Sequence, residues 1–433
     1  MHFHSPAPTI SSELPPSLWA ATAIPAPNTE PLQASTQADV IVIGGGYTGL
    51  STALHLAERG IQACVLEART PGWGGSGRNG GQVIPGLKHD PDTLVAMYGR
   101  ERAEPLIDLV GSGADTVFGL IDRYGIACHP VRAGWIQPAH STRVLETVVK
   151  RAQQWQARGA KVEFLDRAQV SARLGTDAFV GGWVDRRAGS IHPLSYARGL
   201  VGAAQKLKAS IHGKTWVTGL SRVRGAWEAT TATGATVRAP HVVIGTNGYS
   251  DGLWPGLAQT VLAANSFIIA TQPLDGAVAA SILPGGEVAS DSRRLLLYFR
   301  RDEQGRFLLG GRGPFSEPSG PDDWKHLTRS LGLLYPALRD VPIEYRWAGR
   351  VAITRDFVPH VHEPAPGVII ALGYNGRGVA MATQLGKQIA ARIAGESDFP
   401  YPLTEIKPVP LHRLRRLYIG LGIAYYGFLD MLS

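Results

Sequence analysis

The chain has 433 residues, 44% of them hydrophobic and 18% charged, which is the composition of an ordinary folded protein long enough for two domains. Its net charge of +8 comes from 43 basic and 35 acidic residues scattered along the sequence. We expect no nucleic-acid partner, because proteins that bind nucleic acid usually gather their Lys and Arg on one element.

Residues 1–37 are predicted to form an extended N-terminal arm, since they contain seven prolines. The arm lacks the charged start and apolar run of a secretory signal. The chain has two cysteines, and Cys64 lies in the apolar run "QACVLE", which favours a buried thiol over a disulfide with Cys128. We therefore expect the protein in the reducing cytoplasm.

The first elements after the arm predict a βαβ unit. "ADVIVIGGG" begins as a strand of β-branched residues, residues 47–59 have helical spacing, and Gly60 ends that helix. A second strand is predicted over residues 61–68. Strand, helix and strand within about 30 residues indicate a right-handed crossover in a parallel sheet.

The turn of this unit predicts a dinucleotide site. Gly44, Gly46 and Gly49 have the spacing of a dinucleotide-binding turn. The first glycine allows a tight turn, the second allows pyrophosphate to approach the backbone, and the third allows the helix to pack closely on the strand. Glu67, 18 residues after Gly49, is placed to accept hydrogen bonds from both ribose hydroxyls, and its charge disfavours NADP. The predicted contacts here also include Tyr47, Thr48 and Ala68.

A second glycine-rich loop, "PGWGGSGRNGG" at residues 71–81, follows the second strand at once. NAD-binding domains have no need of such a loop, whereas in an FAD site it wraps more of the phosphates and reaches the flavin ring. A surface loop is the alternative. The pattern therefore favours FAD over NAD.

The middle of the chain is rich in antiparallel strand patterns. Helices are predicted over residues 92–97, 101–123 and 141–158, and another after the turn at His192 and Pro193. Among the strands is a hairpin around Gln304 and Gly305.

Near the C-terminus, "GVIIALGYNGRGV" predicts a strand, a glycine-rich turn and a helix. A helix N-terminus with bare glycine amides is an anion site, and in a flavin enzyme it can face the pyrimidine end of the ring.

The fold class is therefore α/β, a Rossmann-like FAD-binding domain of the glutathione-reductase type with an inserted, mainly antiparallel β cap domain. The predicted divisions are residues 1–37 for the arm, 38–125, 189–257 and 349–400 for the FAD domain, 126–188 and 258–348 for the cap, and 401–433 for a C-terminal tail helix.

The tail ends in an apolar stretch with three glycines, residues 419–432, which is short for a transmembrane helix. We expect it to pack on the protein or on a second subunit, with contact to a membrane surface as the alternative. The oligomeric state stays open.

The chain resembles the FAD-dependent oxidoreductases of the D-amino-acid oxidase and sarcosine oxidase superfamily, and within it the bacterial γ-glutamylputrescine oxidoreductase group. Seven motifs between Ala38 and Ala394 carry the resemblance: "ADVIVIGGGYTGLSTALHLAERG", "SGRNGGQ", "GSIHPLSYARGL", "HVVIGTNGY", "YFR…GRFLLGG", "WAGRVAITRDFVPHV" and "GYNGRGVAMATQLGKQIA". Besides the residues of the first turn, the resemblance implies FAD contacts at Ser76, Arg78, Asn79, Gly80, Gly81, Gln82, Val217, Gly373, Asn375, Gly376, Gly378 and Val379.

The resemblance also implies how FAD is held. Sarcosine oxidases attach the flavin through a cysteine in the later part of the chain, and related dehydrogenases attach it through a histidine near the position of Asn79. This sequence has neither residue. We therefore expect non-covalent FAD.

The activity that the resemblance implies is oxidation of an amine carbon–nitrogen bond, with hydride transfer to flavin N5 and hydrolysis of the imine. The substrate is a small amine: a secondary amine, an N-substituted amino acid or a γ-glutamylated polyamine. The flavin is reoxidised either by O2, which gives hydrogen peroxide, or by another electron acceptor. The sequence does not decide whether the enzyme is an oxidase or a dehydrogenase.

Tyr298 and Arg300 are the candidates for catalysis and substrate binding. They alternate with Phe299 on a predicted cap strand, so both point to one face. A solvated arginine at a sheet edge is the alternative for Arg300. Arg377 and Trp347 are second-rank candidates.

The histidines are predicted to be structural rather than catalytic. His192 precedes a proline in a turn, while His360 and His362 resemble loop residues. No pair or cluster has metal-ligand spacing, so no metal is predicted.

Three other functions remain open. A D- or cyclic-amino-acid oxidase would need a pair of arginines facing the flavin. An RNA-modifying flavoprotein would need a basic channel that leads to it. A non-catalytic flavin-binding protein would leave its flavin unchanged when amines are added.

Overall fold

A parallel sheet forms the centre of one half of the molecule in the computed structural model, which describes residues 2–4, 13–313, 316–396 and 399–415. Its order is β10-β4-β3-β14-β21-β20, and every neighbouring pair is parallel except β20 and β21. The strands are β3 (Val40–Ile43), β4 (Ala63–Leu66), β10 (Ser210–His212), β14 (His241–Ile244), β20 (His360–Ala365) and β21 (Val368–Leu372).

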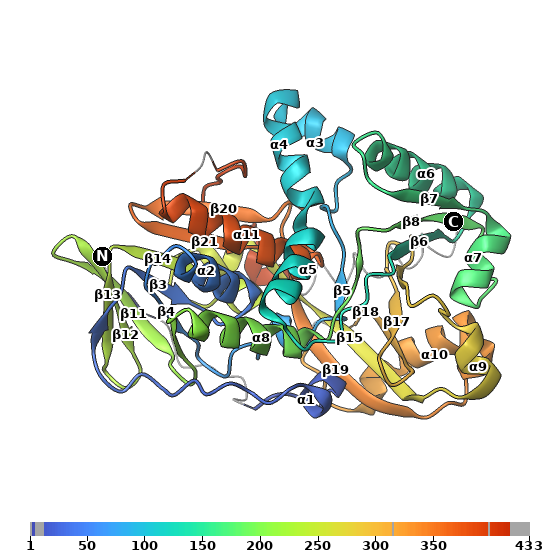
Figure 1. Ribbon diagram of the computed structural model, residues 1–433, viewed down its shortest axis with the longest axis horizontal. Coiled ribbons are helices and arrows are strands. Elements are labelled where there is room, and N and C mark those ends of the chain that lie inside the picture. The colour runs from blue at the N-terminus through green and yellow to red at the C-terminus, as the bar shows by residue number, and fades with distance from the viewer. Residues whose placement is uncertain (1, 5–12, 314–315, 397–398, 416–433) are drawn as a thin grey trace.

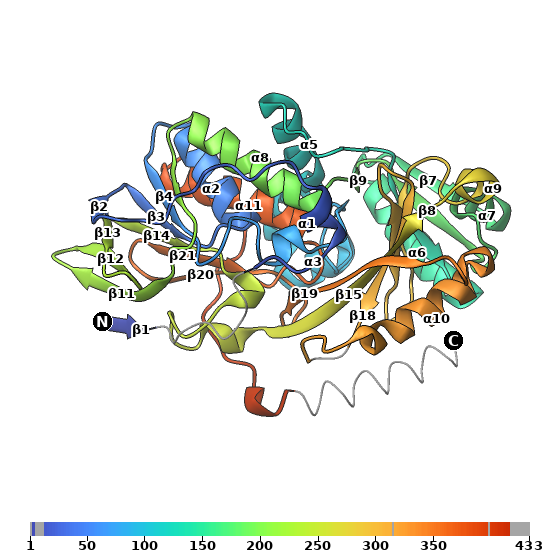
Figure 2. The same ribbon diagram turned by 90° about the horizontal axis from the view of Figure 1, so that it is seen from below.

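Three helices cover one face of this sheet and a β-meander covers the other (Figures 1 and 2). The helices are α2 (Tyr47–Ala57), α8 (Pro193–Lys206) and α11 (Gly378–Ile393); the five-stranded meander sheet contains β1 (His2–His4), β2 (Thr36–Gln37), β11 (Val217–Val223), β12 (Ala226–Thr231) and β13 (Thr236–Ala239). Val40 and Val42 pack toward the helices, while Ile41 and Ile43 pack toward the meander. Burial on both faces explains why β3 consists of four consecutive apolar residues.

An eight-stranded sheet forms the other half of the molecule (Figure 1), and all of its strand pairs except β6 with β16 are antiparallel. In spatial order it contains β19 (Ile343–Ile353), β15 (Leu262–Pro273), β18 (Arg306–Arg312), β17 (Tyr298–Arg301), β16 (Val288–Ser290), β6 (Trp135–Ala139), β8 (Gly181–Asp185) and β7 (Val162–Leu165). The predicted α/β class with an antiparallel cap is confirmed, and the predicted hairpin around Gly305 joins β17 to β18. The exact domain divisions stay predictions, and β19 extends beyond the predicted boundary at residue 348.

The remaining elements surround these sheets. They are α3 (Pro91–Tyr98), α4 (Arg100–Gly111), α5 (Gly113–Tyr124), α6 (Thr142–Gln156), α7 (Arg167–Leu174), α9 (Gly276–Ser281), α10 (Lys325–Leu334) and the two-stranded sheet of β5 (Gln82–Val83) and β9 (Gly189–Ser190). The single helix predicted over residues 101–123 is wrong. It is two helices, because the backbone at Ser112 leaves the helical region and separates α4 from α5.

The prediction of an extended N-terminal arm is wrong at residues 18–22, whereas most of the rest of its described part, residues 13–37, has no regular secondary structure. Residues 18–22 form a short helix, α1 (Leu18–Thr22), which the Ser17 side chain caps by accepting the amide hydrogen of Ala20 at 3.1 Å. Leu18 and Trp19 are fully buried. The Trp19 ring packs on Trp347 at 5.8 Å between centroids. Burial of two apolar side chains outweighs the preference of the surrounding prolines for an extended chain.

The predicted tail helix falls on residues 416–433, outside the described residues. Residues 401–415 are irregular apart from one short turn of helix at His412–Leu414. Within the described ranges, no helix has the length and apolar character needed to cross a membrane.

His192 joins the arm to α8 and has the predicted structural role. It is fully buried, its Nδ1 accepts the amide hydrogen of Ser195 at 3.1 Å as the helix cap, and its Nε2 lies 3.0 Å from the Thr22 hydroxyl. Burial, and then the charge of Arg300, lowers the pKa of His192 to about 3. A proton on Nδ1 would remove the cap.

We predict that His192 makes the folded state sensitive to acid. The unfolded chain binds the proton with a pKa near 6.5 and the folded chain does not, so the free energy of unfolding decreases as pH falls from about 6.5 toward 3 by up to about 1.4 kcal/mol per pH unit. His192→Asn keeps a capping side chain and does not titrate. Urea unfolding at pH 7 and pH 5 should show a smaller pH dependence in the variant, and equal slopes would contradict this role.

Candidate active site

A cavity of about 590 Å³ runs from the carboxyl end of β3 to the eight-stranded sheet. Its walls come from segments that are far apart in the sequence: the β3–α2 turn, the loop of residues 73–82, the segment after β14, strands β16 to β19 and the turn before α11. Carboxyl ends of parallel strands are where α/β proteins bind ligands.

The β3–α2 turn opens this cavity with the N-terminus of a helix, where the Tyr47 amide donates to the Ser76 hydroxyl at 2.9 Å. Gly44 has φ +106°, Gly46 is the N-cap without a side-chain hydrogen bond, and α2 begins at Tyr47. Gly49 lies so close to the strand that an added Cβ would be 2.0 Å from the Gly44 carbonyl oxygen. Free amides at a helix N-terminus attract anions such as phosphate.

Glu67 is held at the end of β4 by two amides. Its Oε2 accepts the Gly45 amide hydrogen at 2.7 Å, and its Oε1 accepts the Arg69 amide hydrogen at 2.8 Å. Burial raises the pKa of this carboxyl, although both hydrogen bonds oppose the shift. A Cβ on residue 45 would lie 3.0 Å from the Glu67 side chain, so Gly45 is needed to leave space for that side chain. The spacing of Gly44, Gly46 and Gly49 in the sequence did not predict this role.

Two tryptophans, Trp19 and Trp347, fix the loop of residues 73–82 because their indole N–H groups donate hydrogen bonds to carbonyl oxygens of the loop. Trp19 donates to the Asn79 oxygen at 2.8 Å and Trp347 donates to the Arg78 oxygen at 2.9 Å. The Arg78 guanidinium lies 4.1 Å above the Trp73 ring. Trp347 is thus a positioning residue that does not line the cavity, rather than a substrate contact.

The turn before α11 forms the third wall. Asn375 has φ +52°, accepts the Thr354 amide hydrogen at 3.0 Å and donates to the Gly373 oxygen at 2.6 Å. Tyr374 and Thr48 join this turn to α2 through their hydroxyls, 2.6 Å apart. Helix α11 begins at Gly378 and, like α2, has no side-chain cap.

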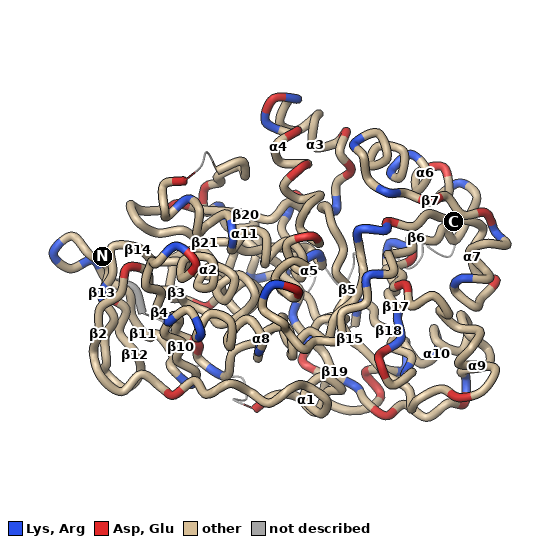
Figure 3. Tube along the Cα trace, viewed as in Figure 1, with Lys and Arg blue, Asp and Glu red and all other residues tan. Residues whose placement is uncertain are grey.

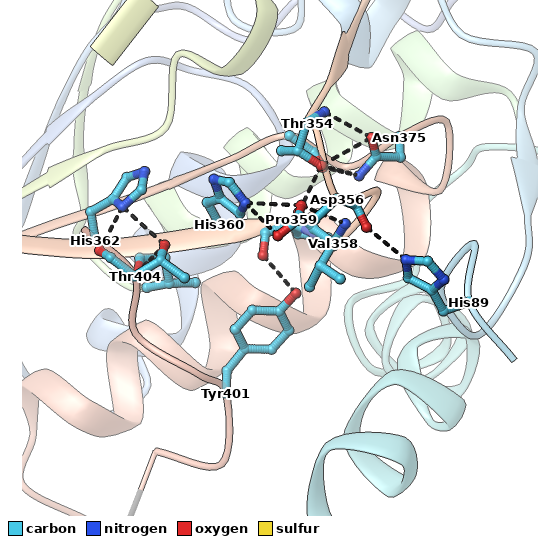
Figure 4. A network of polar contacts seen from close by, with 12 residues as sticks. His89, Thr354, Asp356, Val358, Pro359, His360, His362, Asn375, Tyr401 and Thr404 are labelled. Atoms are coloured by element: carbon cyan, nitrogen blue, oxygen red, sulfur yellow. Dashed lines mark hydrogen bonds and ion pairs between the residues drawn. The ribbon is translucent and has the colours of Figure 1, made fainter. Parts of the chain in front are cut away.

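Figure 4 shows how the neighbouring turn of residues 354–358 is held. The Thr354 hydroxyl donates to the Val358 oxygen at 2.9 Å, and the Asp356 carboxylate lies 3.1 Å from Nε2 of His360. Burial raises the pKa of Asp356, but the hydrogen bond and charge of His360 outweigh it, and the pKa is lowered. These contacts place Phe357, with φ +56°, at the cavity wall.

His360 and His362 lie on β20 and not in a loop, which corrects that part of the prediction. Both take part in the polar contacts drawn in Figure 4, and neither lines the cavity. Across the part of the chain that is described, no group of three His, Cys, Asp or Glu side chains is arranged to hold a metal ion.

Tyr298 lines the cavity from β17. Its ring fits between two glycines, because a Cβ at Gly80 would lie 2.6 Å from the ring and one at Gly310 would lie 2.1 Å from it. Its hydroxyl lies 2.9 Å from that of Ser266. Burial raises the pKa of Tyr298, so this phenol stays protonated at neutral pH.

Arg300 does not line the cavity, which corrects its predicted contact with the substrate. It lies on the same face of β17 as Tyr298, but its Nη1 donates to the Ile191 oxygen at 2.7 Å and to the Gly81 oxygen at 3.2 Å. Burial lowers the pKa of this guanidinium to about 10. Its role is to fix the loop behind the cavity.

Most of the other predicted residues do line the cavity: Gly44, Gly46, Tyr47, Thr48, Glu67, Ala68, Ser76, Arg78, Asn79, Gly80, Gln82, Val217, Asn375, Gly376, Gly378 and Val379. Gly49, Gly81 and Gly373 do not line it and instead shape the adjacent turns. The sequence did not single out Lys88, Trp135 and Arg151, which line the opposite end. Each comes from a different segment, so no local pattern connects them.

Comparisons with known proteins agree with this geometry. The family described as FAD dependent oxidoreductase matches residues 39–392. Over 423 residues the chain is 32% identical to a γ-glutamylputrescine oxidoreductase of Escherichia coli, covering 96% of this chain and 98% of that protein. It is also 32% identical over 410 residues to a protein of Haemophilus influenzae named "Probable oxidoreductase OrdL", covering 92% of this chain and 94% of the other. The crystal structure of a glycine oxidase from Geobacillus kaustophilus superimposes with a TM-score of 0.71 at 20% identity, covering 85% of this chain and 99% of that one.

Proposed function

Because the chain belongs to the family of FAD-dependent oxidoreductases that act on amine or amino-acid donors, we propose that it oxidises the carbon–nitrogen bond of a γ-glutamylated polyamine such as γ-glutamylputrescine. The observation that carries the proposal is the cavity, which extends from the glycine-rich N-terminus of α2 past Tyr298 to a basic far end. A related secondary amine or N-substituted amino acid is the broader class.

The residues present fit FAD. Two helix N-termini without side-chain caps and the bare Gly44 to Gly46 backbone suit a pyrophosphate, and the Glu67 carboxylate suits ribose hydroxyls. Arg78 adds a buried cation that rests on Trp73. We propose that these residues and the other predicted contacts hold FAD non-covalently.

FAD, when bound, supplies the acceptor for a hydride from the amine carbon, and O2 or another acceptor takes the electrons on. The chain itself supplies orientation and a cationic surrounding. Lys and Arg outnumber Asp and Glu in the lining by nine to three: Arg69, Arg78, Lys88, Arg151, Arg293, Arg294, Arg312, Arg350 and Arg377 against Glu67, Asp251 and Asp291. Positive neighbours disfavour an ammonium ion, so the amine binds in the neutral form that can lose a hydride.

The alternative of a D- or cyclic-amino-acid oxidase relied on a pair of arginines beside the flavin, and Arg300 is unavailable for it. The RNA-modifying alternative stays open, because residues of both signs are interspersed over the described chain trace (Figure 3) but the cavity lining is basic. Cys64 and Cys128 are both buried and unpaired, and burial raises the pKa of each thiol to about 12, which supports our proposal of a reducing cytoplasm.

The substrate class is tested by measuring peroxide release from the purified yellow protein. The panel contains polyamines, γ-glutamylated polyamines, N-methyl amino acids and D-amino acids. We expect turnover with the γ-glutamylated polyamines. Peroxide, or transfer to an artificial acceptor, only with D-amino acids would overturn the proposed substrate in favour of the alternative.

Tyr298→Phe is predicted to lower kcat/KM by about 10-fold, because it removes one hydrogen bond worth about 1.4 kcal/mol to the bound amine and keeps the ring between the two glycines. Steady-state kinetics with the best amine of the panel measures it. The visible flavin spectrum should stay unchanged, which distinguishes lost catalysis from lost FAD. Wild-type kcat/KM in this variant would remove Tyr298 from the mechanism.

A further inference from the structure

The end of the cavity opposite the β3–α2 turn contains two cations, Lys88 and Arg377, that form no hydrogen bond or ion pair with any described acid. Of the three acids that line the cavity, Glu67 accepts backbone amides, Asp251 accepts the Leu253 amide hydrogen at 2.9 Å and Asp291 pairs with Arg293 at 2.7 Å. None of these contacts involves Lys88 or Arg377.

Arg377 presents an unsatisfied guanidinium to the cavity. It lies 4.6 Å above the Trp135 ring, and its Nη1 is inaccessible and has no hydrogen-bond partner among the described residues. The nearest acids are engaged elsewhere, since Asp185 pairs with Arg187 at 2.7 Å and Asp90 pairs with Arg151. The guanidinium therefore has a charge that no described acid neutralises through a hydrogen bond or ion pair, and an anionic ligand in the cavity would balance it.

Lys88 adds a second cation at the same end. Its side chain is exposed to the interior of the cavity, and it makes no ion pair or hydrogen bond with any described residue. Desolvation, followed by the charges of Arg377, Arg312 and Arg151, lowers the pKa of its ammonium to about 7. An anion that joined the group would raise this pKa and favour the charged form of Lys88.

The strand order gives the separation of this cation pair from Tyr298. Tyr298 on β17 pairs with Ser290 on β16, and the Ser290 hydroxyl accepts the Trp135 indole hydrogen from β6 at 3.0 Å. Trp135 itself pairs with Val288, two residues before Ser290, so Tyr298 and Trp135 are two strands and two residues apart, roughly 12 Å between their Cα atoms. The Arg377 guanidinium lies above the ring of Trp135, so it is at the end of the cavity away from Tyr298.

We propose that Lys88 and Arg377 bind a carboxylate of the substrate that lies roughly 12 Å from the oxidised carbon–nitrogen bond, with Trp135 packed on the chain between them. This inference rests on the proposed function and narrows its substrate class. An amine with a distant carboxylate fits the site, whereas an α-amino acid, whose carboxylate adjoins the reacting carbon, does not span it. An unmodified polyamine places an ammonium ion against two cations and is repelled.

The test uses two inert probes that differ only in the carboxylate, N-butylglutaramate and N-butylpentanamide. Neither contains an oxidisable amine, so binding to the FAD-loaded protein is measured without turnover, by titration calorimetry and by the change in the flavin spectrum. The wild-type protein should bind the carboxylate probe at least 10-fold more tightly than the neutral probe. Equal affinity for the two probes would overturn the proposal, whether or not any amine is oxidised.

Three variants and a control locate the binding. Lys88→Met and Arg377→Gln should each weaken binding of N-butylglutaramate about 10-fold and leave N-butylpentanamide unchanged, and Lys88→Arg should retain the preference. Lys150→Met removes the same charge from an exposed position on α6, beside Arg151, and should bind both probes as the wild type does.

Two results would contradict the assignment to these residues. One is an unchanged preference for the carboxylate probe in Lys88→Met and Arg377→Gln. The other is a shift of the flavin reduction potential in Arg377→Gln without any change in probe affinity, which would show that Arg377 serves the cofactor and not the substrate.

Discussion

Replacing Gly49 with alanine is expected to abolish FAD binding. The added methyl carbon would lie 2.0 Å from the Gly44 carbonyl oxygen and 3.0 Å from Cγ1 of Val42, and the first of these is a backbone atom that no rotamer change can move. Helix α2 would have to shift away from β3, which displaces the amides at its N-terminus from the pyrophosphate. The ratio of flavin absorbance to protein absorbance after purification measures the loss.

Gly202→Ala is the matched control for this substitution. Gly202 lies inside α8, and a methyl group added there would have no atom outside the helix within 4 Å. Alanine at this position should keep FAD and increase the free energy of unfolding by up to about 1 kcal/mol, because it favours the helix. Full occupancy by FAD in Gly49→Ala would mean that the β3–α2 turn does not hold the cofactor.

Glu67→Gln is expected to raise the Kd for FAD by about 10- to 100-fold, equivalent to roughly 1.4–2.7 kcal/mol. Glu67 uses one oxygen for the Gly45 amide hydrogen and the other for the Arg69 amide hydrogen. A glutamine replaces one of these acceptors with an NH2 group that faces an N–H donor, and it also removes the charge that orients ribose hydroxyls.

Quenching of flavin fluorescence as the apoprotein is titrated with FAD measures this Kd. Glu146→Gln, an exposed position on α6, removes the same charge far from the cavity lining and should leave the Kd unchanged. A Glu67→Gln protein with wild-type affinity would show that the ribose is bound by other residues.

Local patterns were sufficient to predict the fold class. The strand of four apolar residues, the three spaced glycines and the acid 18 residues later all fall within one βαβ unit, where sequence spacing sets the geometry directly. The alternation of Tyr298 and Arg300 also placed both on one face of β17 correctly. What alternation could not show is that Arg300 donates to the Gly81 carbonyl and does not line the cavity, whereas Tyr298 does line it.

The rest depends on contacts between distant segments. Trp19 donates a hydrogen bond to the loop of residues 73–82 from 60 residues away in the sequence. The prolines around Trp19 led to the prediction of an extended segment instead of helix α1. The cation pair at the far end combines Lys88 with Arg377, whose guanidinium lies above the ring of Trp135 from a third segment of the chain. Spacing along the chain contains no information about such a site.

Anaerobic mixing of the FAD-loaded protein with γ-glutamylputrescine tests the central claim most directly, since it reports hydride transfer whatever the final electron acceptor. The account predicts that the visible absorbance of the oxidised flavin bleaches, that it returns when air is admitted or an artificial acceptor is added, and that Tyr298→Phe bleaches about 10-fold more slowly. A flavin spectrum that stays unchanged with this substrate and with every other amine of the panel would contradict it.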